Sequence, residues 1–152
     1  MPVRHPRHEQ LGHGTEAAKF PAGNAIETTK ERFMYPDFIK MLPLADVNFP
    51  GAEARLISGS YGQVAFWRFE EGGSVPPHRH GAQLGIVLRG QVTLTVEGVT
   101  HTWQAGDVFN IDENDEHSAT VAPGTYVVEV YQESDRHREL EQPTVPQFVD
   151  PA

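Results

Sequence analysis

Residues 72–90 of the chain read GGSVPPHRHGAQLGIVLRG and contain two histidines, His78 and His80, one residue apart. The segment is expected to form a β-strand, in which side chains alternate between the two faces, so positions i and i+2 point the same way. Two imidazoles on one face of one strand can bind one metal ion. The apolar run 84–88 that follows ends at Gly90 and predicts a buried strand closed by a turn.

A metal ion needs more than two protein ligands, and His117 is the candidate for the next one. It ends a second segment, residues 106–117, with the sequence GDVFNIDENDEH. Neutral imidazole nitrogens suit a borderline divalent ion. The alternative is a set of core histidines without a metal, and the closely spaced pair together with His117 favours the metal. Of the other histidines, His101 is expected to be a packed or surface side chain and His137 a solvated one.

These two segments resemble the two sequence motifs of the cupin superfamily, and the resemblance extends over about residues 54–131. The positions that correspond to the first motif are Gly72, His78, His80, Gln83 and Gly90, and those that correspond to the second motif are Gly106, Asp112, Asn114, His117 and Val121. The resemblance implies a barrel of β-strands that holds one divalent transition metal ion, namely Zn, Ni, Fe, Mn or Cu. The ligands that it implies are His78, His80, Gln83 and His117.

One departure from the family pattern concerns the chemistry of the metal. Gln83 stands where the commoner cupin ligand is Glu. A Glu ligand would cancel one charge of the ion, whereas a Gln ligand leaves every protein ligand neutral. A divalent ion in such a site is expected to hold an anionic or carbonyl-bearing molecule and to polarise it. The ligand set fits less well to ferrous oxygenases, whose sites contain a carboxylate.

The last predicted strand, residues 125–131, offers a group that could accept a proton. Glu129 and Tyr131 share one face of this strand, while Val128 and Val130 share the other. If the odd positions point inward, Glu129 lies in an apolar cavity and burial raises its pKa. If they point outward, Glu129 is an exposed residue of an edge strand, and the sequence leaves both orientations open.

A second, weaker resemblance concerns the same region. The small cupins of pectin and alginate breakdown, which open unsaturated uronates to keto sugars, carry a Gln in the first motif and an acidic residue, an aromatic residue and an Arg near the last strand. Gln83 matches their Gln, Glu129 stands for their Asp and Tyr131 for their Phe. Arg136 stands for their Arg, one residue later in the chain. The resemblance implies catalytic roles for Glu129, Tyr131 and Arg136.

Short apolar segments separated by turn signals predict eight or nine strands and no long helix. Together with the resemblance, this predicts an all-β fold, a single cupin barrel (double-stranded β-helix or jelly roll) with an N-terminal arm. Residues 1–42 are expected to form the arm and an apolar packing segment, residues 43–134 the barrel and residues 135–152 a C-terminal tail. Residues 28–35 carry a weak helical signal that ends at Pro36, and residues 135–140 are expected to form one helical turn.

The composition limits the partners. The chain has 21 acidic and 12 basic residues and a formal net charge of −9, which argues against binding to nucleic acid or an anionic membrane surface. It contains no cysteine, so neither disulfides nor thiolate ligands are available. No apolar run approaches the ~20 residues of a membrane span and no apolar leader is seen, so a cytoplasmic location is expected. The apolar residues among positions 33–39 are expected to pack on the barrel or on a second subunit of a homodimer.

Three functions follow from these observations. The first is a metalloenzyme of the isomerase or lyase type, which transfers a proton on, isomerises or eliminates from a small anionic molecule, such as one derived from a sugar. The second is a metal-dependent dioxygenase. The third is a barrel that binds a small molecule without catalysis.

Overall fold

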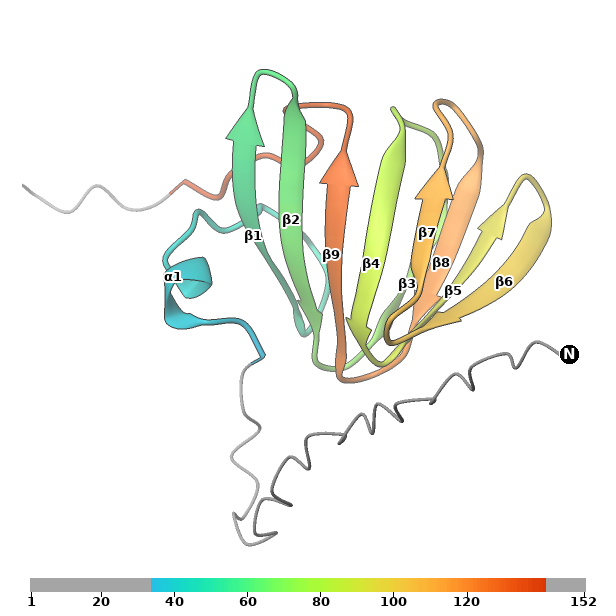
Figure 1. Ribbon diagram of the computed structural model, residues 1–152, viewed down its shortest axis with the longest axis horizontal. Helices are drawn as coiled ribbons and strands as arrows, with labels where there is room; N and C mark the ends of the chain where they lie inside the picture. Colours follow the sequence, from blue (N-terminus) through green and yellow to red (C-terminus); the bar gives the residue numbers. More distant parts are fainter. Residues whose placement is uncertain (1–33, 142–152) are drawn as a thin grey trace, which may run out of the picture. The chain divides into compact units, whose positions relative to one another are not determined.

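A computed structural model describes residues 34–141, which form nine β-strands and one short helix (Figure 1). The elements are α1 (Asp37–Lys40), β1 (Ala52–Gly59), β2 (Gly62–Phe69), β3 (Gly73–His78), β4 (Gln83–Arg89), β5 (Gln91–Val96), β6 (Val99–Gln104), β7 (Val108–Ile111), β8 (His117–Val121) and β9 (Thr125–Tyr131). One sheet has the strand order β1-β2-β9-β4-β7 and the other β3-β8-β5-β6, and all pairs are antiparallel. The all-β prediction is confirmed.

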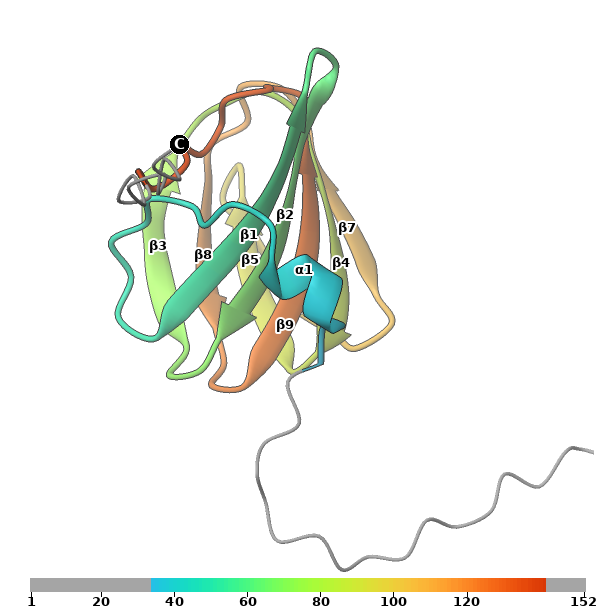
Figure 2. The same cartoon turned by 90° about the vertical axis from the view of Figure 1, so that its left-hand side faces the viewer.

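The two sheets face each other, as the turned view shows (Figure 2), and the core lies between them. The alternation in β2 places Ala65, Trp67 and Phe69 on the inner face, and β5 contributes Val92 and Leu94 to the core. The predicted alternation of these two strands is therefore observed. It turns one face of each strand away from water, which is the pattern of a sheet that packs on a second sheet.

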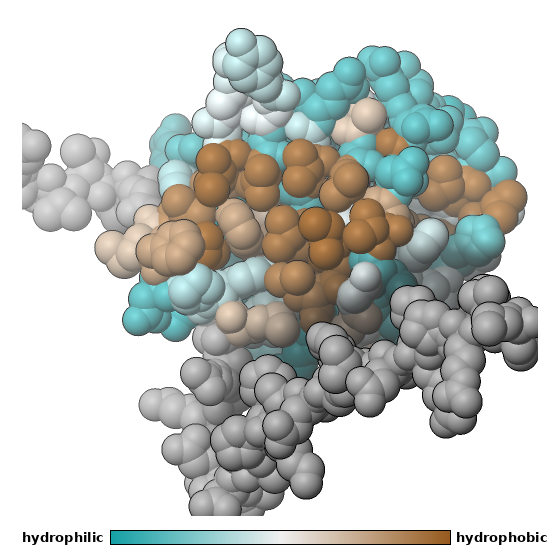
Figure 3. Space-filling view, in the orientation of Figure 1, coloured by the Kyte–Doolittle hydropathy of each residue, from teal (hydrophilic) through white to brown (hydrophobic). Residues whose placement is uncertain are grey.

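The apolar run in β4 is only half buried, contrary to the prediction of a buried strand. The odd positions from Gln83 to Val87 point into the core, whereas Leu84 on the other face is 38% exposed. The reason is that β4 lies inside the five-stranded sheet, whose outer face is largely uncovered by the described residues. Figure 3 shows a broad apolar band on this face, which includes the exposed side chains of Ile57, Leu84, Val108 and Val130.

The segment before the barrel covers part of the outer face. Of the apolar residues expected to pack on the barrel or on a second subunit, Tyr35 and Ile39 are buried against Tyr126 of the barrel, whereas Met34 and Phe38 are exposed. The hydroxyl of Tyr35 lies 2.7 Å from the carbonyl oxygen of Trp67, to which it donates a hydrogen bond. Pro36, expected to end a helix, instead forms the N-cap of α1. Most of the predicted helical segment 28–35 lies outside the described residues, as do the rest of the predicted arm and the end of the C-terminal tail.

The chain after β9 returns along the segment before β1. Glu139 forms an isolated β-bridge with Ala45, and the amide of Leu140 donates a hydrogen bond of 2.7 Å to the carbonyl oxygen of Leu44. The predicted helical turn at residues 135–140 is therefore wrong, because the backbone pairs with an extended segment instead of with itself. Within the described residues, no helix has the length and the hydrophobicity needed to cross a membrane.

Candidate metal centre

His78 and His117 lie opposite each other on neighbouring strands. His78 is the last residue of β3, His117 is the first residue of β8, and the two are direct partners in the antiparallel register. Side chains of directly opposed residues point to the same face of a sheet. This pairing brings two imidazoles that are 39 positions apart in the chain to a ring-centroid distance of 4.3 Å.

His80 does not lie on the same strand as His78, contrary to the prediction. Strand β3 ends at His78 because its partner β8 begins at His117, so no backbone is left to pair with. His80 is held instead by the loop between β7 and β8, since the amide of Asn114 donates a hydrogen bond of 2.9 Å to the carbonyl oxygen of His80. The guanidinium of Arg79 also donates to the carbonyl oxygen of Asn114. The two histidines still converge, but through a contact between loops.

The backbone fixes which nitrogen of each ring carries the proton. The Nδ1 atoms of His78, His80 and His117 each lie 2.8 Å from a backbone carbonyl oxygen, belonging to Pro76, Gly81 and Asp115 respectively. A carbonyl oxygen only accepts hydrogen bonds, so each neutral ring must carry its proton on Nδ1. All three Nε2 atoms are then lone-pair donors. An imidazole that donates its other N–H to a backbone carbonyl is the usual arrangement of a metal-bound histidine.

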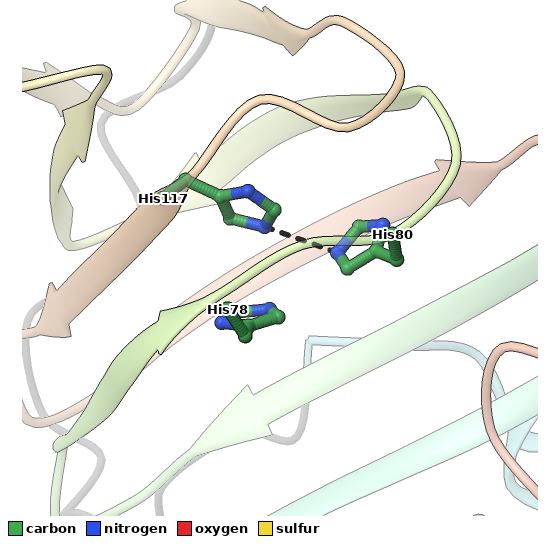
Figure 4. Close-up of side chains that lie close together, drawn as sticks. All are labelled: His78, His80 and His117. Atoms are coloured by element: carbon green, nitrogen blue, oxygen red, sulfur yellow. Dashed lines mark hydrogen bonds between the residues drawn. The ribbon is translucent and has the colours of Figure 1, made fainter.

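The three Nε2 lone pairs point at a common place (Figure 4). Nε2 of His117 lies 3.0 Å from Nε2 of His80, and the ligand atoms of the three rings all lie within 4.8 Å of one another. With both protons on Nδ1, the 3.0 Å contact has no hydrogen between the nitrogens, so a cation is needed to make it favourable. Two ligands at about 2.0–2.1 Å from one ion are about 2.9–3.4 Å apart, and the widest pair must close by at most about 2 Å.

The protonation of these rings also suits a metal. Burial lowers the pKa of His80 and of His117, and repulsion from the Arg136 guanidinium and the neighbouring histidines acts in the same direction. Hydrogen bonds to the carbonyl oxygens of Gly81 and Asp115 oppose this shift. The net lowering keeps both rings neutral at pH 7, and only a neutral imidazole can bind a metal. The described residues thus fit a divalent transition ion.

A cavity of about 110 Å³ lies between the two sheets and includes His78 and His117 in its wall. Gln83, the fourth predicted ligand, is 8% exposed and lies in the same wall, at the start of β4. Its side chain lies close enough to Glu129 to act on the pKa of that carboxyl group. The structure therefore places three histidines together and Gln83 on the cavity beside them.

Glu129 points into the cavity, because the odd positions of β9 are the inward ones. Its direct partners in the register are Ala65 on β2 and Gly85 on β4, which are both small. Burial raises the pKa of Glu129, while hydrogen bonds from Tyr131, Trp67 and Gln83 and the nearby Arg136 act in the opposite direction. A raised pKa makes the carboxylate a stronger proton acceptor than a glutamate in water.

Three side chains form a short hydrogen-bonded relay to this carboxylate. The hydroxyl of Tyr131 donates to Oε2 of Glu129, and it accepts from Nε1 of Trp67 at 3.3 Å. Nε2 of His137 lies 3.2 Å from the same hydroxyl. Because the proton of Tyr131 is already used, His137 must donate with its Nε2–H. The relay holds the carboxylate in one orientation.

His137 was expected to be solvated, but it is half-buried and lines the cavity. Burial lowers its pKa to about 4, with the positive charge of Arg136 acting in the same direction. Its position follows from the pairing of Glu139 with Ala45, which draws the segment after β9 over the barrel. No periodicity marks that pairing in the sequence, so no local signal could have identified His137 as a site residue.

Arg136 also lines the cavity, and its Nε atom is buried without a hydrogen-bond partner among the described residues. A buried guanidinium nitrogen without an acceptor is uncommon, because leaving it unpaired costs free energy. The geometry therefore leaves one strong donor free for an anion that enters the cavity. His101, by contrast, is exposed, as predicted.

Comparison with known families agrees with this fold. The family model described as "Cupin domain" matches residues 65–131, which run from the inner face of β2 to the end of β9. The chain carries a cupin domain. No curated protein matches the sequence. The matched residues contain all four predicted ligands and Glu129, and they form a single barrel.

Solved structures show the same fold at low sequence identity. KdgF from Halomonas sp. is 23% identical, with a TM-score of 0.55 and coverage of 63% of this chain and 91% of that chain. An RmlC-like cupin from Shewanella frigidimarina is 19% identical, with a TM-score of 0.57 and coverage of 70% and 94%. A single-residue variant of oxalate decarboxylase from Bacillus subtilis is 15% identical, with a TM-score of 0.55 and coverage of 63% and 28%. At these identities the similarity shows the fold alone.

Proposed function

We propose that this cupin is a metal-dependent enzyme that moves a proton on a small anionic molecule bearing a carbonyl group. The observation that supports the proposal most is a cluster of three imidazoles, two of which line the cavity, together with a separate carboxylate in the wall of the same cavity. A purely structural metal site would have no need of a desolvated carboxylate on the opposite sheet. A base close to a metal is a common arrangement in enzymes that abstract protons.

The proposed ligands are His78, His80 and His117, with Gln83 as the fourth. All four are neutral, so a bound divalent ion keeps its full charge, and it would act as a Lewis acid on a carbonyl oxygen. The buried Nε of Arg136 would bind the carboxylate of the substrate. The metal ion and Arg136 would together fix the position of the substrate. They would thereby fix the position of the carbon atom beside the carbonyl group, whether or not that atom lies between the carbonyl and the carboxylate.

Glu129 is the proposed base. It would take the proton from the carbon beside the carbonyl, so that the C–H bond breaks, its electron pair enters an enolate and an O–H bond forms on Glu129. Returning the proton to another atom of the same molecule completes an isomerisation. Tyr131 would keep the carboxylate aimed at that carbon through its hydrogen bond. The raised pKa of Glu129 favours the abstraction step.

The resemblance to the cupins of pectin and alginate breakdown suggests a sugar-derived acid as one class of substrate. The proposal excludes nucleic acid and membranes as partners, which the net charge of −9 supports. It keeps the cytoplasm as the location, which a chain without cysteine permits.

A homodimer also belongs to the proposal. The outer face of the five-stranded sheet exposes Leu84, Val108 and Val130 on three neighbouring strands, with Leu84 directly opposite Val130, and a second copy would cover them. Light scattering at micromolar concentration should give twice the mass of the chain. A monomer mass would contradict this part of the proposal and leave the reaction untouched.

The reaction is tested in two steps. Metal analysis of the purified protein should find about one transition ion per chain in the wild type and much less in His117→Ala. The metal-loaded protein is then incubated in D₂O with an unsaturated uronate and with 2-oxo acids, and NMR follows turnover and deuterium exchange beside the carbonyl. Glu129→Gln should lower the rate by at least ~100-fold.

The matched control is Glu133→Gln. Its carboxylate lies 3.9 Å from Nδ1 of His80 but is not part of the cavity wall. This variant should retain most of the activity. Equal rates in Glu129→Gln and wild type would remove the proposed base, and oxygen uptake in place of exchange would show a dioxygenase.

A further inference from the structure

We infer that the cavity selects a substrate with an apolar body, that is, a small acid whose carbonyl carries a hydrocarbon or aromatic group, in preference to a polyhydroxylated sugar acid. The reaction on this substrate rests on the function proposed above, but the selection follows from the cavity wall alone. The inference rests on the strand registers, which place polar and apolar side chains at different ends of the cavity.

The metal-site residues and Tyr131 lie at one end of the cavity. His78 is paired with His117, and Tyr131 is the partner of Gln83 across the five-stranded sheet. These residues are at the end of β3, the start of β8, the end of β9 and the start of β4. Because the strands are antiparallel, these four positions meet at the same edge of the barrel. Glu129 lies two residues further in.

The other end of the cavity is apolar. Val121 lies four residues after His117 on β8, and Val127 lies four residues before Tyr131 on β9, so each is about 13 Å from the polar end. Val92 is the direct partner of Val121. The apolar side chains that line this part of the wall include Phe69, Val75, Val92, Leu94, Val121 and Val127.

Among the described residues that line this end, the one hydrogen-bonding side chain is Trp67, the direct partner of Val127, and its Nε1 already donates to the hydroxyl of Tyr131 at 3.3 Å. Thr125, two residues before Val127 on β9, is a buried polar residue that is not part of the wall. Its hydroxyl lies 2.7 Å from the carbonyl oxygen of Ala122, to which it donates, and it accepts from the amide of Gln91 at 3.1 Å. It is therefore not available to a ligand.

Few hydrogen-bonding groups at the polar end are free to bind a ligand. Tyr131 already binds Glu129, Trp67 and His137. What is left for a ligand is the Nε of Arg136, the metal site and the carboxylate of Glu129, whose Oε2 already accepts from Tyr131. Arg136 and the metal site match one carboxylate and one carbonyl oxygen, so among the described residues the Glu129 carboxylate is the remaining partner for the several hydroxyls of a sugar acid.

The consequence for affinity is large. Each hydroxyl buried without a partner weakens binding by roughly 5- to 150-fold. Each methylene group buried in an apolar wall strengthens binding by about 4-fold. A sugar acid of the same length as an aliphatic acid loses on both counts. We therefore expect the wall to discriminate by more than tenfold.

The test is calorimetric titration with three monoanions: 4-methyl-2-oxopentanoate, pyruvate and D-galacturonate. The first should bind at least tenfold more tightly than either of the other two. Pyruvate has the same 2-oxo carboxylate group but only a methyl group as its apolar part. The titrations are made with metal-loaded and with metal-free protein, because the order of the three should be the same in both. Galacturonate binding as tightly as 4-methyl-2-oxopentanoate would overturn the inference, and so would an absence of 4-methyl-2-oxopentanoate binding at 10 mM, roughly the limit set by millimolar affinity.

The variant Val121→Thr places a hydroxyl at the apolar end with little change in volume. It should reduce the preference for 4-methyl-2-oxopentanoate over pyruvate by about fivefold and leave pyruvate unchanged. Ala119→Ser, at another position of the wall, gives the same test if the first variant folds poorly. An unchanged preference in a folded variant contradicts the inference. A protein that prefers the apolar acid but shows no proton exchange would contradict the proposed function alone.

Discussion

Replacing Glu129 by Gln should make the protein more stable, and increasingly so as the pH rises. The glutamate is placed among Ala65, Gly85 and the cavity wall, where burial raises its pKa from the usual 4.5. Above pH 4.5 the unfolded chain releases this proton while the folded chain still holds it. The folded state is then progressively disfavoured until the pH reaches the native pKa. A glutamine at position 129 has no proton to release, so this loss is absent.

The size of the effect follows from linkage. One proton held by the folded state and not by the unfolded state changes the free energy of unfolding by about 1.36 kcal/mol per pH unit. Between pH 4.5 and pH 6.5 the variant can therefore gain at most about 2.7 kcal/mol over the wild type. Below pH 4.5 the difference should be flat. It should level off again above the native pKa, so the curve measures that pKa.

Urea unfolding of both proteins in EDTA, at half-unit steps from pH 4 to pH 8, gives the measurement. All other titrating groups are shared by the two proteins and cancel in the difference. EDTA removes the charge of any metal, which would otherwise favour the ionised carboxylate. A difference that does not change between pH 4.5 and pH 7 would refute the reasoning, because it would mean that Glu129 titrates alike in the folded and unfolded states.

Three further predictions concern the metal, His137 and Gly85. A transition ion at 100 times its Kd should stabilise the wild type by about 2.7 kcal/mol, or on the order of 10 °C in melting temperature, and the shift should disappear in EDTA and in His117→Ala. The lowered pKa of His137 means that, from about pH 6.5 down to about pH 4, the unfolded chain takes up a proton that the folded chain does not. Stability should therefore fall with the pH in that window by about 1–2 kcal/mol, after allowance for solvent at the half-buried ring, and His137→Gln should remove the slope in urea titrations. Gly85→Ala should cost about 1–3 kcal/mol in urea unfolding, because its Cβ would lie 2.0 Å from the buried ring of Phe109. Gly59→Ala, where nothing lies within 4 Å, is the control and should stay within about 0.5 kcal/mol of the wild type.

The spacing of the two motifs was enough to predict the barrel and to bring His78 and His117 together. Both depend on patterns that a strand imposes locally, since alternation and turn residues are visible in the sequence. The position of His80 was not predictable in this way. Strand β3 ends two residues before His80, because its partner β8 begins at His117. Where β8 begins is determined by a different segment of the sequence.

The orientation of β9 could not be read from its sequence either. The strand has apolar residues at odd and even positions alike, such as Val127 and Val128, so no alternation identifies the inner face. The structure resolves this through tertiary packing. Tyr35 and the segment that follows it cover Tyr126 and Val128 on the outer face, which leaves the odd positions to the cavity. The inward face of β9 is therefore determined by residues some 90 positions earlier in the chain.

The row of residues around Glu129 explains why stability and reactivity are opposed in this site. Across the sheet the order is Ala65, Glu129, Gly85 and Phe109, and directly opposed side chains share a face. The ring of Phe109 occupies the space above Gly85. Any larger residue at position 85 would clash with this ring. The carboxylate therefore has a methyl group on one side and an aromatic ring beyond the other, and neither can solvate its charge. The arrangement that makes the ionised carboxylate costly to bury is the same one that makes it a strong base, so a change that lowers the pKa of Glu129 should stabilise the barrel and slow the proton transfer together.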